Sequence, residues 1–286
     1  TEDGKYLVAT QPGHVEFLGP NFQVKPILEI QEDVDRASGS INFLGDIHIH
    51  GDVCSGATIR ALGNIQIDGV IEDCTIEAAE NLIVSSGVQG QDRAVLRACK
   101  SVFAKYLEHC CVYARESVQA DCIIDCEIYS NGGVRACTGR GVIIGGTIRS
   151  AAEVSATMVG SKAERLTNVV LGGLPCEESE RVQMLEEIAA TEEALRECET
   201  LPDGPDRESR LSKLRLNLCV SKMKMEKFDK ELRIKAAAAL TEDHRRLISS
   251  AVYPGTVVTI GHSSFRANRV EHDCVIGVSR GYVGRL

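Results

Sequence analysis

A short repeat between Gly39 and Gly173 is the feature that most constrains what this chain can fold into. One apolar anchor, usually followed two residues later by a small residue, recurs at positions 41, 59, 76, 96, 112, 128 and 148. A second apolar anchor follows each of these after an interval of six residues, at positions 47, 65, 82, 102, 118, 134 and 154. The return interval varies between 10 and 14 residues, so one corner of the repeat is constant and the rest is not.

A repeat of 16 to 20 residues fits one turn of a coil built from short strands. Alternation within a strand places Ile47 and Ile49 on one side and His48 and His50 on the other. When such turns stack in parallel, each buries its aliphatic side against the next, so the turns are stable only together. The sequence therefore predicts a mainly β protein with a right-handed parallel β-helix over residues 39–175.

The segments on either side of the repeat have different patterns. Residues 1–38 hold strand-like pieces broken by glycine and proline, which we expect to cap the first turn. After Pro175 the apolar period lengthens to about 3.5, which predicts an inserted antiparallel coiled-coil helical hairpin over residues 176–251, interrupted at 201–205. Strand patterns resume over residues 252–286, which we expect to return to the β-helix.

Charge and hydropathy exclude some classes of function. A formal net charge of -9 argues against nonspecific binding to nucleic acid or to an anionic membrane. No apolar run reaches the roughly 20 residues that cross a bilayer, and no signal peptide opens the sequence. The chain begins at Thr1 without Met, which we interpret as a piece of a longer protein.

The twelve cysteines do not have the spacing of a metal site or a disulfide framework. Cys74, Cys110 and Cys126 each precede an inward anchor by two residues, where other turns carry Ala57 and Ala94. We interpret them as small core residues and predict no cofactor and no metal. So many unpaired thiols favour a reducing cytoplasm.

Two outward columns are candidate partner-binding surfaces. The first is a stripe formed by Arg60, Glu77, Arg97, Tyr113, Tyr129 and Arg149. Arginine and tyrosine are enriched at protein interfaces, and stacked neighbours can form cation–π contacts, so we hypothesise that this stripe docks a protein partner. The second column contains outward Ile83 and Phe103, which either bind a partner or are covered by the long helix or the terminal strands.

Other residues of the sequence raise metal-binding and enzymatic alternatives to these surfaces. His48 and His50 face the same way near Asp46 and Asp52, but spacing fixes no third ligand, which favours a solvated strand face. Acyltransferases with a left-handed β-helix would show strict hexapeptides, which the variable interval excludes. An enzyme acting on carbohydrate or acyl groups stays as an alternative, although no convergent set of ionisable residues is evident.

An ordered set of motifs resembles the flagellar assembly protein A family. The motifs are the segment from Gly45 to Val53, residues 104–108, Gly145–Gly146, residues 159–161 and residues 253–255. The resemblance implies a noncatalytic bacterial protein of the cytoplasm that acts in flagellum formation at the cell pole, with the family's separate N-terminal domain missing here. It also implies protein partners in the flagellar or polar-localisation machinery, a regulatory signalling protein among them.

The same fold is similar to two other kinds of β-helix, those of bactofilin-type polymer formers and of the septum-site protein family. A polymerising scaffold is therefore an alternative function. Self-association through the helical hairpin is a further one.

Overall fold

The computed structural model describes residues 8, 13–19, 21–200, 205–238, 244–279 and 281–286. The chain divides into two compact units. One comprises Thr1–Gly172 and His244–Leu286 and contains the strands, and the other, Gly173–Asp243, contains two helices. The helical unit is inserted between two strands of the first unit.

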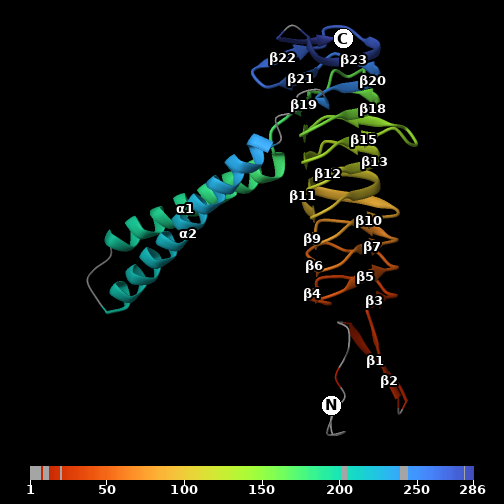
Figure 1. The fold of residues 1–286 in the computed structure, drawn as a ribbon. Coiled ribbons are helices and arrows are strands. Elements are labelled where there is room, and N and C mark those ends of the chain that lie inside the picture. Colours follow the sequence, from red (N-terminus) through yellow and green to blue (C-terminus); the bar gives the residue numbers. More distant parts are fainter. Residues whose placement is uncertain (1–7, 9–12, 20, 201–204, 239–243, 280) are drawn as a thin grey trace. The chain divides into compact units, whose positions relative to one another are not determined.

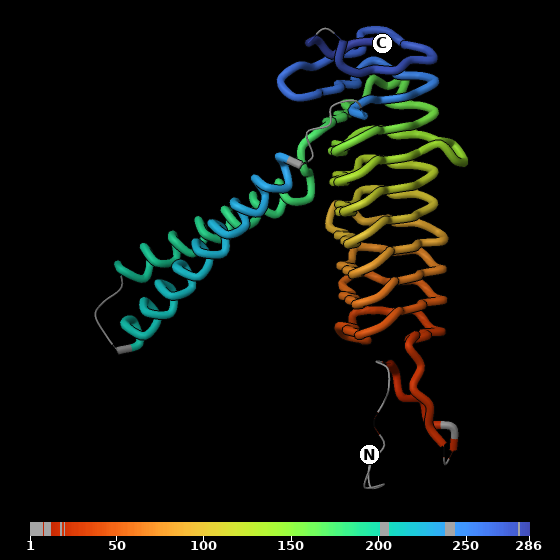
Figure 2. The backbone as a smooth tube through the Cα atoms, viewed as in Figure 1, coloured from red at the N-terminus to blue at the C-terminus, as the bar shows by residue number. Residues whose placement is uncertain are grey.

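The first unit is a parallel β-helix, as the repeat predicts. Each full turn passes along three faces before the chain steps to the next turn, and Figures 1 and 2 show these turns stacked in chain order. The three faces are numbered here in the order in which the chain visits them.

Face 1 and face 3 carry most of the ladder. Face 1 is formed by β3 (Ile27–Ile30), β5 (Asp46–Ile49), β7 (Ile65–Ile67), β10 (Leu82–Val84), β15 (Val134–Ala136), and the first residues of β12 (Val102–Ala114), β13 (Val118–Ile124), β18 (Val154–Val159) and β20 (Leu247–Val252). Face 3 is formed by β4 (Ser40–Phe43), β6 (Thr58–Ala61), β9 (Thr75–Ala78), β14 (Glu127–Ser130), β17 (Thr147–Ser150), β19 (Thr167–Leu171), β21 (Thr256–Ile260), and the last residues of β11 (Gly87–Ala98) and β12.

Face 2 is short and joins the other two. It contains β8 (Val70–Ile71), β16 (Val142–Ile144), the start of β11, the middle of β12, and the ends of β13, β18 and β20. Bridges through Val34 and Val53 extend it toward the first turns. The variable interval of the repeat spans this face, which explains why its length changes from turn to turn.

The predicted register is confirmed at every anchor. On face 1, Ile47 opposes Ile65, Ile65 opposes Leu82, and the series continues in register to Val154. On face 3, Ile41 opposes Ile59, and that series runs to Ile148. All of these residues except Ile41 are at most 1% exposed, so the anchors form two aliphatic stacks inside the coil.

The constant corner between face 3 and face 1 is held by a polar ladder. Asp46 Oδ1 accepts from the backbone N–H of Asn64 at 2.6 Å, and Asn64 Oδ1 accepts from that of Asn81 at 3.1 Å. Asn81 Oδ1 in turn accepts from the backbone N–H of Ser101 at 3.2 Å. Because each side chain satisfies the backbone of the following turn, an insertion would leave donors unpaired, which accounts for the fixed length of the corners from Asp46 to Ser101.

Two predicted boundaries need correction. The coil begins at β3, inside the segment 1–38 that was predicted to be a cap, because Leu28 and Ile30 already oppose Ile47 and Ile49. Before it, β1 (His14–Leu18) and β2 (Asn21–Lys25) pair only with each other among the described strands. At the other end the coil resumes at Leu247 rather than at residue 252, because Leu247 and Ser249 are already inward and buried.

Antiparallel strands close the C-terminal end of the coil. Strand β22 (Ser263–Arg266) pairs with β21, and β23 (Glu271–Ser279) pairs with β20 and with β24 (Tyr282–Arg285). Inward Cys274 and Ile276 cover the last aliphatic layer and are 2% and 1% exposed. The parallel stack therefore ends at this layer.

The inserted unit is a helical hairpin of α1 (Pro175–Thr200) and α2 (Pro205–Ala238). Ion pairs join the two helices at Glu177–Lys235, Arg181–Asp229, Glu192–Lys222 and Glu199–Arg215. Partners late in α1 pair with residues early in α2, so the helices run antiparallel. Of the predicted interruption at 201–205, residues 201–204 lie outside the described residues, and Pro205 is the first residue of α2.

Candidate functional site

The six residues of the predicted first stripe form a continuous column on the outside of face 3. Strand pairing places Arg60 opposite Glu77, Glu77 opposite Arg97, and Arg97 opposite Tyr113. The column continues through Tyr129 to Arg149. We call Arg60, Glu77, Arg97, Tyr113, Tyr129 and Arg149 the Arg/Tyr ladder. Its geometry confirms the predicted alignment, whereas partner binding by it remains a proposal.

Aromatic and cation–π contacts hold the centre of the ladder. The rings of Tyr113 and Tyr129 stack with centroids 4.8 Å apart and planes inclined by 12°. The guanidinium carbon of Arg97 lies 4.3 Å from the centroid of Tyr113, and that of Arg149 lies 5.0 Å from the centroid of Tyr129. Two stacked phenol rings are thus enclosed between two cations, as the ring quadrupole favours.

Carboxylates hold the arginines at both ends of the ladder. Glu77 accepts from Arg60 Nε at 2.7 Å and lies 3.9 Å from Arg97 Nε. Glu127, which the sequence interpretation missed, accepts from Arg149 Nη1 at 2.7 Å. Glu127 precedes Tyr129 by two residues on β14, so strand alternation alone could have placed it on this side.

The second predicted column lies on face 1, where Ile83 opposes Phe103. Both side chains are 37% exposed. They line a shallow depression of about 270 Å³ together with Ala104, Gln119 and Thr138. Among the residues that the structure describes, the terminal strands therefore leave these apolar side chains partly exposed.

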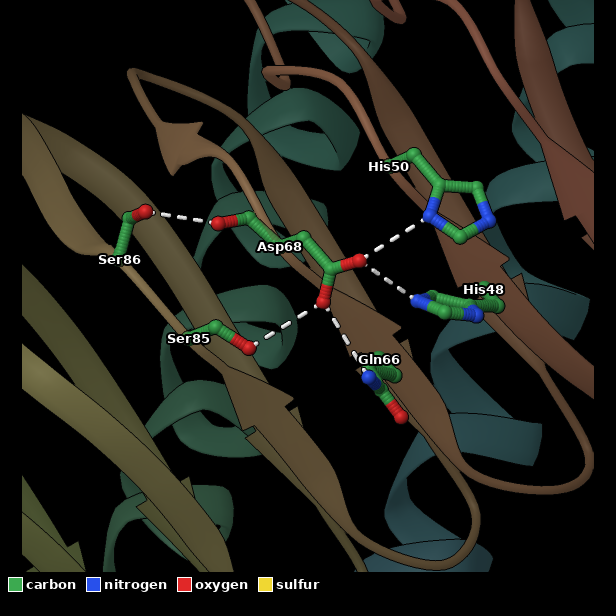
Figure 3. Close-up of polar contacts among 6 residues, drawn as sticks. All are labelled: His48, His50, Gln66, Asp68, Ser85 and Ser86. Carbon is green, nitrogen blue, oxygen red and sulfur yellow. Dashed lines mark hydrogen bonds and ion pairs between the residues drawn. The ribbon is translucent and has the colours of Figure 1, made fainter.

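A third group of polar residues lies near the start of face 1, where His48, His50 and Asp68 converge (Figure 3). Asp68 Oδ2 accepts from His48 Nε2 at 2.9 Å and from His50 Nδ1 at 3.1 Å. Hydrogen bonds from Gln66 and then from His48 lower the pKa of Asp68 to about 2. Asp68 comes from the turn after the two histidines and was not predicted.

Asp46 and Asp52, which lie nearest to the histidines in sequence, have other contacts. Asp46 accepts from the backbone of Asn64, and Asp52 Oδ1 accepts from the backbone N–H of Val70 at 2.7 Å. Both carboxylates therefore join successive turns. The repeat itself could have identified Asp68. A residue one repeat away lies next to the histidines in the neighbouring turn, whereas Asp46 and Asp52 are near them only in sequence.

A family model described as the Flagellar Assembly Protein A beta solenoid domain matches residues 26–283. The chain belongs to this family. The match confirms the resemblance, and it begins one residue before β3, where the structure places the first turn of the coil. No curated protein and no solved structure matches the chain.

The range matched to the flagellar assembly protein A family includes every candidate surface described above. The matched range contains the Arg/Tyr ladder, the depression at Ile83 and Phe103, the histidine cluster and the helical hairpin. Among the described helices, neither α1 nor α2 has an apolar stretch of the length that a membrane crossing requires.

Proposed function

We propose that this chain is a noncatalytic scaffold in bacterial flagellar assembly that binds a protein partner through the Arg/Tyr ladder. Family membership supports the assembly role. The stacked Tyr113–Tyr129 pair between Arg97 and Arg149 is the observation that carries the binding surface. We further propose that binding takes place in the cytoplasm at the cell pole, with partners from the flagellar or polar-localisation machinery.

The ladder suits binding because its side chains are already ordered. Each ring is fixed by a stacked ring on one side and a guanidinium on the other, so little side-chain entropy remains to be lost on association. Tyrosine and arginine are also the residue types that concentrate binding energy in interfaces. The column spans six turns of a rigid coil, which presents them on one line.

Charge indicates the kind of partner surface. The ladder contains three arginines and one glutamate, although the whole chain carries a net charge of -9. When the neighbouring Glu127 is included, three arginines are balanced by two glutamates, so this surface has a net charge of only +1 on an acidic protein. We therefore propose that the partner presents an acidic surface, which would be steered to the stripe by charge and released faster at high salt.

A noncatalytic role agrees with how the charged groups of the ladder are arranged. Glu77 and Glu127 are engaged by arginines of the same surface, and the aromatic rings fill the space between the cations. A general acid or base needs a group free to meet a substrate, usually inside a pocket. The ladder offers a paired strip of surface instead.

Replacing both tyrosines tests this proposal. In the Tyr113→Ala/Tyr129→Ala variant we expect the affinity for each specifically captured flagellar partner to fall about 30-fold, since a buried aromatic anchor contributes about 2 kcal/mol or more. Partners would be captured with the full chain from a flagellated host, identified, purified and titrated by calorimetry. The same variant, fused to a fluorescent protein, should lose its polar position and fail to restore motility in a deletion strain.

A matched control changes the outside of face 1 at the same height. Arg135 and Ser155 oppose one another there, outside the depression at Ile83 and Phe103, and Arg135→Ala/Ser155→Ala should keep wild-type affinity. Unchanged titrations of every captured partner with the tyrosine variant would refute docking at the ladder. A drop caused equally by both double variants would assign the effect to the coil as a whole.

Self-association through the hairpin is a second candidate function, supported by an apolar stripe on α2. Leu216, Val220 and Met223 follow a four-three spacing and are 64%, 41% and 66% exposed. They lie apart from the inward-facing Leu218 and Met225 of the same helix. A second copy of the hairpin could cover this stripe.

Light scattering on the full chain tests the hairpin proposal. If the wild type is a dimer, Leu216→Lys/Met223→Lys and a deletion of the hairpin should both give monomers. Lys213→Ala/Lys224→Ala, on the same helix, is the control and should remain dimeric. A monomeric wild type at micromolar concentration, or dimers that survive the lysine substitutions, would refute self-association through this stripe.

A further inference from the structure

We propose that His48, His50 and Asp68 form a binding site for one divalent transition-metal ion of the zinc class. The proposal is independent of the Arg/Tyr ladder, because it concerns the outside of face 1 in the first turns. It rests on the convergence of two imidazoles and one carboxylate (Figure 3).

Strand geometry brings the three ligands together. His48 and His50 alternate with inward Ile47 and Ile49 on β5, so both imidazoles project from the same side of one strand. Parallel pairing then places β7 beside β5 and brings the carboxylate of Asp68 up to both rings. The two rings lie with centroids 4.0 Å apart and converge on one oxygen.

The distances fit a small tetrahedral ion. Ligand atoms about 2.0–2.1 Å from zinc stand roughly 3.3 Å from one another in a tetrahedron. The observed separations to Asp68 Oδ2 are 2.9 Å and 3.1 Å, and the three ligand atoms all lie within 4.8 Å of one another. The two imidazole nitrogens would each move away from Asp68 Oδ2 by a few tenths of an ångström to reach that spacing.

The surroundings of Asp68 resemble the outer shell of a metal site. Gln66 Nε2 and Ser85 Oγ donate to Asp68 Oδ1 at 3.2 Å and 3.3 Å, and Ser86 Oγ donates to its backbone carbonyl at 2.7 Å. These contacts leave Oδ2 directed at the imidazoles. Hydrogen bonds of this kind orient ligating carboxylates and raise metal affinity.

Ligand chemistry selects the class of ion. Two imidazoles with one carboxylate suit Zn²⁺, Co²⁺ or Ni²⁺, whereas Mg²⁺ and Ca²⁺ prefer oxygen ligands only. The side chains of His48, His50 and Asp68 are 25%, 35% and 35% exposed. The cluster therefore opens to solvent on one side, where water or a partner group would complete the tetrahedron.

Titration of the chelator-treated full chain with Zn²⁺ and with Co²⁺ tests the proposal. We expect one equivalent of Co²⁺ to give the visible spectrum of a tetrahedral nitrogen–oxygen site. Cys99, Cys137 and Cys219 are exposed, so the near-ultraviolet band of cobalt thiolates must be recorded as well. No saturable binding, or a thiolate band at one equivalent, would overturn the proposal.

The chain supplies its own conservative substitutions for the ligands. Gln66 occupies the position equivalent to His48 in the next turn. The position equivalent to His50 is occupied by Asp68 in the next turn and by Ser85 in the turn after that. His48→Gln/His50→Ser therefore introduces residues that the coil already carries at these positions, and the variant should fold. We expect this variant to lose the cobalt spectrum, and Ser85→Ala to weaken metal binding about tenfold.

The control is His109→Gln. The imidazole of His109 contacts Asp92 at 3.0 Å without a second histidine, so this variant should bind metal like the wild type. Metal binding that survives the double substitution would refute the assignment, and circular dichroism would confirm that each variant is folded.

Discussion

At the scale of single residues, the buried cysteines show how the coil selects for size. Cys74, Cys110 and Cys126 share one inward position with Ala57 and Ala94 and are at most 4% exposed. The sulfurs of Cys110 and Cys126 lie 3.5 Å apart. This confirms the interpretation of these cysteines as small core residues. Burial also raises the pKa of the Cys74 thiol to about 12, because the thiolate would lose its hydration.

The raised pKa of Cys74 predicts a loss of stability at alkaline pH. The unfolded thiol loses its proton near pH 9.0, whereas the folded thiol keeps it to about 12, so in that window the folded state binds more protons. The contribution of Cys74 to the free energy of unfolding is therefore fully present below pH 9.0 and falls as pH rises toward about 12.

Urea unfolding at several pH values should show a shallower decline in the free energy of unfolding for Cys74→Ala than for the wild type. Cys99→Ala, at an exposed thiol, is the control and should follow the wild type. Parallel curves for all three proteins would contradict this prediction.

At the scale of the elements, the helical hairpin contains an ion pair with unequal burial. The side chain of Glu177 at the start of α1 is 5% exposed, and that of Lys235 near the end of α2 is 49% exposed. Lys235 Nζ donates to Glu177 Oε1 at 3.1 Å. Removal of the lysine would leave a buried carboxylate without this charge partner, which is more costly than loss of a surface pair.

Lys235→Met is accordingly expected to destabilise the hairpin by about 1–3 kcal/mol. The matched control is Lys227→Met on the same helix, whose partner Glu231 is 3.8 Å away and 57% exposed. A surface pair of that kind contributes less than about 1 kcal/mol. Thermal melting followed by helical circular dichroism would measure both changes. Equal shifts in the two variants would show that burial of Glu177 does not matter.

At the scale of the whole coil, stability comes from contacts between adjacent turns. A residue in a middle turn packs against the equivalent residue on both sides, whereas one in the first turn of its stack has a single neighbour. Ile76 lies between Ile59 and Leu96 and is 0% exposed. Ile41 opposes only Ile59 and is half-buried.

This difference predicts unequal costs for one chemical change. Ile76→Ala should lower the free energy of unfolding by about 2–5 kcal/mol, because it opens a cavity between two turns. Ile41→Ala should cost roughly half as much, since only one neighbouring turn loses its contact. Urea titrations of the two variants and the wild type would decide the matter. If the end substitution were the more damaging of the two, stacking would not be the main source of stability.

The sequence predicted the inside of the coil better than its outside. The anchors could be placed in register because a constant six-residue corner fixes which residue meets which. The first turn at β3 was missed because Pro26 and Gly19–Pro20 interrupt the pattern before it. Asp68 was missed because its partners lie one repeat away, and contacts across turns follow only once the stacking is known. Glu127 was missed although alternation along β14 places it on the same side as Tyr129, because the stripe was traced through one residue per turn.

The spacing of the Arg/Tyr ladder restricts what can bind to it. Adjacent strands of a sheet lie about 4.8 Å apart, so the ladder repeats its groups at that pitch. An α-helix lying along the ladder rises about 5.4 Å in each turn, so its side chains fall out of register with the ladder by about 0.6 Å per contact. Neighbouring strands of a partner sheet have the same spacing as the ladder and stay in register with it over the full length. The spacing of the ladder therefore favours a partner that presents neighbouring β-strands.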